Sequence, residues 1–133
     1  MAHLIRKLTG SFSNAFRGIY TILASQVNFR IHLLIMAIAV AGGLLFKISA
    51  GEWTAVILSS GLVLAAECMN TAVEFLGDSV TKDENPHIRK AKDVAAAGVL
   101  LAAIAAAIVG LVVFFPYFLK LFEPVDRAHI CRE

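Results

Sequence analysis

The 133-residue sequence is poor in charged residues: Asp, Glu, Lys and Arg together make up 17% of it, and the formal net charge is only +2. Hydrophobic residues make up 59%, and the mean hydropathy is +0.77. A soluble domain of this length has amphipathic periods and many more polar residues, so the composition excludes that class. The small net charge and the lack of a basic-aromatic module give no reason to expect a nucleic-acid partner.

Recognisable chemical motifs are scarce as well. The sequence has two cysteines, Cys68 and Cys131, and their positions indicate neither a disulfide framework nor a metal site. Its four histidines show no metal-ligand spacing. The glycine-rich phosphate-binding motifs and the motif set of the water-soluble kinases are absent. A nucleotide that binds this chain must therefore do so without a familiar nucleotide fold.

Three long apolar blocks are present, at residues 31–46, 53–77 and 94–119. A helix that crosses a bilayer needs about 20 mostly apolar residues, within a usable range of roughly 17–25. The second and third blocks meet this length, and the first meets it if the helix continues to Ile48. We therefore expect an all-α membrane protein with one domain over residues 1–133. Its transmembrane helices are expected at about 31–49, 53–78 and 92–119.

The N-terminal segment has apolar residues at helical spacing rather than in the short apolar core of a signal peptide. These residues are Leu4, Ile5, Leu8, Phe12, Ala15, Phe16, Ile19 and Leu23. Polar and basic residues oppose them, which predicts an amphipathic helix over residues 1–28 on the membrane surface. A helix packed on other protein is the alternative. Residues 120–133 are expected to form a loose tail.

The distribution of basic residues predicts the topology. Most of them lie in the N-terminal segment or near the start of the last apolar block: Arg6, Lys7, Arg17, Arg30, Lys82, Arg89, Lys90 and Lys92. Because Lys and Arg collect on the cytoplasmic side, we expect the N-terminus and the 79–91 loop to be cytoplasmic. Trp53 and Tyr117 then both lie at the outer interface, where aromatic residues are enriched.

The second apolar block is interrupted by a polar stripe within the stretch AAECMNTAVEFLGD. Relative to Glu67, Glu74 lies about 20° behind and Asp78 about 20° ahead, with Asn70 about 60° away, at roughly 100° per residue. A carboxylate at the centre of a membrane helix costs roughly 2.5–3.5 kcal/mol on insertion scales. A polar clasp between helices is one explanation. Three carboxylates and an asparagine on one stripe are more than a clasp needs, and this favours a functional site.

The start of the last apolar block carries charges that would lie at the same interface. These are Arg89, Lys90, Lys92 and Asp93, preceded in the loop by Asp83, Glu84 and Asn85. Lysines beside carboxylates suit a site for phosphate and metal, with lysine on phosphate oxygens and carboxylates holding Mg²⁺. The alternatives are basic anchors that reach the interface and solvated loop residues.

These stretches together resemble a known signature. AECMNTAVEFLGD followed by AKDVAAAGVLL resembles the motif of the prokaryotic diacylglycerol kinases, which include the undecaprenol kinases. The resemblance extends from about residue 5 to residue 119 and includes NAFRGI and NFRIHL. It implies a small multi-pass kinase of the bacterial cytoplasmic (inner) membrane that works as a homotrimer with shared active sites. Such an enzyme moves the γ-phosphate of MgATP to a lipid hydroxyl at the cytoplasmic interface.

The resemblance also implies roles for individual residues. Glu67 corresponds to the catalytic base, close to the lipid hydroxyl, and Glu74 to a metal ligand. The nucleotide-binding positions are Asn14, Gln26, Glu74, Asp83, Glu84, Asn85, Lys92 and Asp93. The lipid-binding positions are Lys7, Asn28, Arg30 and Glu67. Asn70 and Asp78 match further polar positions of the motif.

Gln26 departs from the family pattern, which usually has a glutamate there as a second metal ligand. A glutamine carbonyl still coordinates a hard cation but brings no charge, so we expect weaker Mg²⁺ binding. Undecaprenol is the favoured lipid because NFRIHL and ENPHIRKAKDVAAAGV look closer to that branch, and diacylglycerol is the alternative. A rival of another class is a non-enzymatic membrane subunit whose carboxylates line an ion or proton path.

Overall fold

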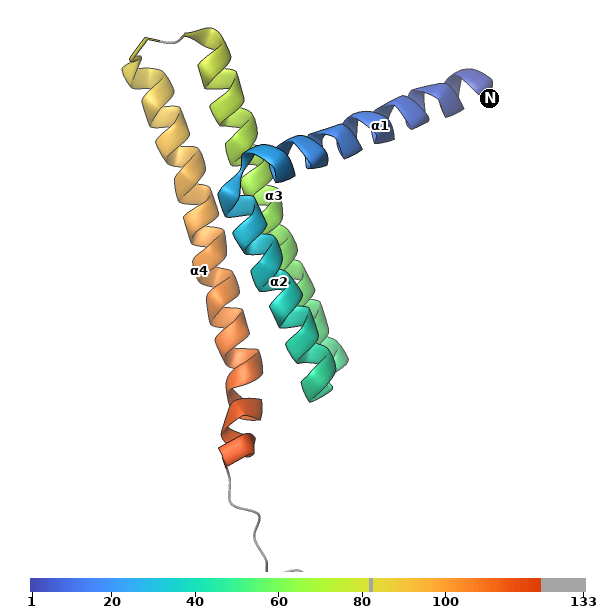
Figure 1. Ribbon diagram of the computed structural model, residues 1–133, viewed down its shortest axis with the longest axis vertical. Helices are drawn as coiled ribbons and strands as arrows, with labels where there is room; N and C mark the ends of the chain where they lie inside the picture. The colour runs from blue at the N-terminus through green and yellow to red at the C-terminus, as the bar shows by residue number, and fades with distance from the viewer. Residues whose placement is uncertain (82, 123–133) are drawn as a thin grey trace, which may run out of the picture.

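The computed structural model describes residues 1–81 and 83–122, which form four helices and no strand. The helices are α1 (Ala2–Ser25), α2 (Val27–Phe46), α3 (Ala50–Val80) and α4 (Pro86–Phe122). Helices α2, α3 and α4 run side by side, whereas α1 leaves the bundle sideways (Figure 1). The predicted all-α class is confirmed. Most of the predicted tail, from residue 123 onward, lies outside the described residues.

Helices α2, α3 and α4 are each long and apolar enough to cross a membrane, as predicted. Helices α3 and α4 are longer than the expected spans, with 31 and 37 residues. At about 1.5 Å per residue they measure about 46 and 55 Å, against a hydrocarbon core of about 30 Å. Both therefore extend past the apolar layer. The turn that joins them carries charged residues, which fits a position in the polar interface.

A break at Gln26 separates α1 from α2. Gln26 has extended backbone angles (φ −108°, ψ 113°), and its N–H donates to the Ile22 carbonyl at 2.8 Å. The N-terminal helix therefore ends at Ser25, three residues before the expected end at 28, and α2 begins before the expected residue 31. Ile22 is buried, whereas most of α1 is exposed, so α1 is attached to the bundle at its C-terminal end.

The turn between α2 and α3 is fixed by side-chain caps. The Ser49 hydroxyl accepts from the Glu52 N–H at 3.4 Å, and Glu52 Oε2 accepts from the Ser49 N–H at 2.7 Å, which together form a capping box. The same Glu52 oxygen accepts a hydrogen bond from the Tyr117 hydroxyl at 2.9 Å. This end of the bundle is therefore linked across α3 and α4 as well as along the chain.

Apolar packing next to this turn holds the three long helices together. Ile48, Val56 and Val113 are buried and form a small core. Phe46 stacks on Tyr117 with ring centroids 5.6 Å apart. The helices come close at Gly43, where an added Cβ would lie 2.8 Å from the Trp53 ring and 3.0 Å from Ile48. A side chain at position 43 would therefore force its neighbours to shift.

We expect Gly43→Ala to destabilise the protein by about 1–3 kcal/mol, because overpacking forces the neighbouring side chains out of their rotamers. Thermal unfolding in detergent measures the loss. Gly51→Ala is the control, since nothing lies within 4 Å of a Cβ at that position. Equal melting temperatures for Gly43→Ala and the wild type would contradict the close packing at Gly43.

Candidate active site

Glu74 lies at the level of the α1–α2 junction, and amide groups hold both of its oxygens. Gln26 Nε2 donates to Glu74 Oε2 at 3.2 Å. Asn70, one turn earlier on α3, donates from Nδ2 to Glu74 Oε1 at 3.1 Å. The structure thus brings together the two residues that the family resemblance implied as metal ligands. They are 48 positions apart in the sequence.

The atoms around Glu74 suit a hard cation. The Asn70 carbonyl oxygen is buried and has no hydrogen-bond partner among the described residues, so its lone pairs are available to a ligand. Gln26 offers a second amide oxygen and Glu74 a carboxylate. In the described chain no cluster of three or more His, Cys, Asp or Glu could hold a metal. A cation here would therefore need phosphate oxygens as well, which is how Mg²⁺ is commonly bound.

Glu67 lies on the same helix face, about 10 Å from Glu74 toward the middle of α3. Its side chain is only 3% exposed, and its Oε1 lies 3.3 Å from Nε2 of His32 on α2. A buried carboxylate in a membrane span is costly and is usually paired or functional. His32 supplies the partner, and the sequence reasoning missed it because histidines were considered only for metal spacing.

Antiparallel pairing of α2 and α3 is the signal that would have found His32. Gln26 and His32 are six residues apart, and their partners Glu74 and Glu67 are seven apart in the opposite direction. Both separations correspond to roughly 10 Å along a helix. Once Gln26 is placed beside Glu74, the antiparallel register brings His32 beside Glu67.

A polar pocket of about 500 Å³ lies at the α3–α4 turn. Six of the expected site residues line it: Asp78, Asp83, Glu84, Asn85, Lys92 and Asp93. Lys92 Nζ pairs with Asp78 Oδ1 at 2.5 Å, which joins the end of α3 to the start of α4. The helices approach closely at Gly77, where a Cβ would lie 2.9 Å from both Lys92 Cε and Ile88 Cγ2. The pocket is therefore lined by two basic side chains, Arg89 and Lys92, and by several carboxylates at a helix junction.

Asn85 has a structural role at the edge of this pocket. Its Oδ1 accepts from the His87 N–H at 2.9 Å and from the Ile88 N–H at 3.4 Å. These bonds satisfy two of the free N–H groups at the start of α4, and Pro86 occupies the first helical position. This cap explains why α4 begins at residue 86 rather than at the expected 92.

The other four predicted site residues lie on α1 and at the start of α2. Lys7 and Asn14 are exposed on α1, and Asn28 and Arg30 are exposed at the start of α2. Over the described residues, none of these four side chains forms a hydrogen bond or ion pair with α3 or α4. A single chain therefore does not assemble all the residues that the resemblance implied.

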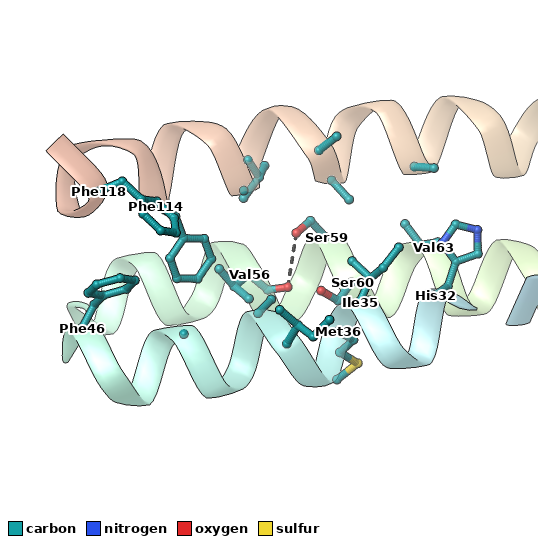
Figure 2. A pocket seen from close by; sticks show the side chains of 18 residues that line it. His32, Ile35, Met36, Phe46, Val56, Ser59, Ser60, Val63, Phe114 and Phe118 are labelled. Atoms are coloured by element: carbon teal, nitrogen blue, oxygen red, sulfur yellow. Dashed lines mark hydrogen bonds between the residues drawn. The ribbon is translucent and has the colours of Figure 1, made fainter. Parts of the chain in front are cut away.

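An apolar groove of about 400 Å³ runs between α2, α3 and α4 (Figure 2). Phe46, Phe114 and Phe118 lie at one end, and His32 lies beside Val63 at the other. Val63 is one helical turn before Glu67 on α3. The groove therefore leads along the bundle to the His32–Glu67 pair.

Over most of its length the sequence is similar to one protein family and to two named kinases. The family model described as prokaryotic diacylglycerol kinase matches residues 13–114. An undecaprenol kinase of Bacillus subtilis is 34% identical over 106 residues, which are 80% of this chain and 86% of that protein. A diacylglycerol kinase of Synechocystis is 38% identical over 112 residues, which are 84% of this chain and 64% of that protein.

The cap at Asn85 leads to a test of its contribution to stability. Asn85→Ala should destabilise the protein by about 0.5–2 kcal/mol, because two N–H groups lose their acceptor, whereas Asn85→Asp should keep the cap. Thermal unfolding in detergent measures both variants. A melting temperature of Asn85→Ala equal to that of the wild type would show that the cap contributes nothing.

Proposed function

The chain belongs to the prokaryotic diacylglycerol kinase family, as its motifs predicted, and we propose that it transfers the γ-phosphate of ATP to the hydroxyl of a membrane lipid. Members of this family are lipid kinases, so a lipid kinase is favoured over a non-enzymatic subunit with an ion or proton path. The detailed proposal rests on the order of three features along α3. The buried carboxylate of Glu67 lies beside the apolar groove, and the amide-held carboxylate of Glu74 comes next. The pocket that Lys92 lines follows at the end of the helix.

The apolar groove supports a lipid as the phosphate acceptor. A hydrocarbon chain in the groove would place the lipid's polar end near His32 and Glu67. A hydroxyl needs a base as it attacks phosphorus, and a positioned base contributes roughly 10²–10⁴-fold. Glu67 takes this role in the proposal. Lys7, Asn28 and Arg30 are proposed to contact the lipid headgroup.

The polar pocket and the Glu74 cluster are proposed to hold MgATP. Mg²⁺, when bound, neutralises charge on the phosphate oxygens during transfer. Glu74 would hold it, together with the carbonyl oxygens of Gln26 and Asn70. Lys92 is free to exchange its partner Asp78 for a phosphate oxygen, because both side chains are partly exposed. The remaining proposed nucleotide contacts are Asn14, Asp83, Glu84, Asn85 and Asp93.

We further propose that α1 is amphipathic and lies on the cytoplasmic surface of the inner membrane, with the 79–91 loop on the same side. The chain is proposed to form a single kinase domain that works as a homotrimer with shared sites. The sideways course of α1 supports this, because the helix that carries Lys7 and Asn14 leaves the bundle of its own chain (Figure 1). A neighbouring subunit would bring such residues to the site.

Undecaprenol is the proposed lipid and diacylglycerol is the alternative. Each is the substrate in the name of one similar protein. The experiment incubates the purified protein with labelled ATP and vesicles that contain either lipid, side by side. Faster labelling of undecaprenol supports the proposal, and faster labelling of diacylglycerol reverses the assignment.

Glu67→Gln should lower turnover by about 10²–10⁴-fold, because it removes the base and keeps the shape of the side chain. Labelled-lipid formation at saturating ATP and lipid measures the rate, and thermal unfolding checks that the variant is folded. Turnover at the wild-type rate in a folded Glu67→Gln variant would remove Glu67 from the catalytic step.

Gln26→Glu should shift the Mg²⁺ activation curve several-fold to lower concentration. Two anionic groups attract Mg²⁺ more strongly than one, by on the order of 1 kcal/mol at a partly wet site. The titration is run at fixed ATP and lipid, and saturating Mg²⁺ should bring the rates of the two proteins closer together. Superimposed titrations for the variant and the wild type would place Gln26 outside the metal site.

A further inference from the structure

Among the described residues, Glu67 has one basic partner within ion-pairing distance of its buried carboxylate, and that is His32. The two come from different helices, α3 and α2, with Nε2 and Oε1 3.3 Å apart. Carboxylates in membrane spans are held by a partner because their desolvation is costly. His32 therefore matters to where the Glu67 carboxylate points.

The two side chains differ in their access to the groove. Glu67 is 3% exposed and is not among the groove residues, whereas His32 is 22% exposed and lines the groove end (Figure 2). A lipid chain in the groove thus meets the imidazole beside the carboxylate. The separation of 3.3 Å is long for a hydrogen bond. Catalytic contacts of this kind are often long without substrate and shorten in the reactive complex.

We propose that His32 is a positioning residue, whose ring N–H holds the Glu67 carboxylate in the orientation that receives the proton of the lipid hydroxyl. This inference rests on the proposed function, in which Glu67 is the base. No bond to His32 is made or broken in the step. The hydroxyl proton passes to a Glu67 oxygen as the lipid oxygen attacks the γ-phosphorus and ADP leaves.

A matched pair of substitutions tests the role of the ring N–H. His32→Leu fills the space without a donor, whereas His32→Gln places an amide N–H at a similar reach. His32→Leu should lower kcat by on the order of 10²-fold, since a misplaced catalytic group costs about this much. The KM for ATP should stay unchanged, because the polar pocket is two to three turns away. His32→Gln should recover most of the lost kcat.

The same substitutions in a Glu67→Gln background show whether His32 acts through Glu67. If it does, His32→Leu lowers the residual rate little further, because the group that it positions is already lost. His3→Leu is the control, since His3 is exposed on α1. Thermal unfolding of each variant in detergent separates a loss of folding from a loss of turnover.

Three results overturn the inference. They are a wild-type kcat in His32→Leu, an equally low kcat in His32→Gln, and a full additional loss in the Glu67→Gln background. A wild-type rate in Glu67→Gln alone is different, because it overturns the assignment of the base in the proposed function. The two failures are therefore distinguishable in one set of variants.

Discussion

The Glu67 carboxylate is buried in a membrane-spanning helix, and this burial calls for a partner from a second helix. A charge at the centre of a span costs several kcal/mol unless a partner or a cavity receives it. Here the partner is His32, which α2 presents at 3.3 Å from the carboxylate. The antiparallel packing of α2 on α3 is needed to form this pair, and the packing near Gly43 and Trp53 holds that arrangement at the far end.

The polar groups of α3 change in character along the helix. Glu67 lies beside the apolar groove, Glu74 is held by two amides at the α1–α2 junction, and Asp78 pairs with Lys92 in the pocket at the turn. This order matches a reaction whose two substrates come from different phases. A lipid chain is soluble only in the hydrocarbon, and a nucleotide only in water. A helix of 31 residues is long enough to reach both.

The sequence predicted the helical class and the three spanning helices, because their signal is a local one of length and hydropathy. It also predicted that Glu67, Glu74 and Asp78 share a face, since helix geometry fixes this. The helix ends were less accessible, because they depend on the backbone at Gln26 and on the Asn85 cap. His32 was missed because its role depends on the register of α2 against α3. The roles proposed for Lys7 and Asn14 cannot be judged from one chain, because both residues are exposed on α1.

The proposed function depends above all on the transfer of phosphate to a lipid. A mass balance on the purified wild-type protein tests it most directly. The protein is incubated in undecaprenol or diacylglycerol vesicles with ATP labelled at the γ-phosphate, and ADP, inorganic phosphate and labelled lipid are measured together. A lipid kinase should form one labelled lipid phosphate for each ADP, with little free phosphate. ADP accompanied by free phosphate alone, or no label in either lipid, would contradict it.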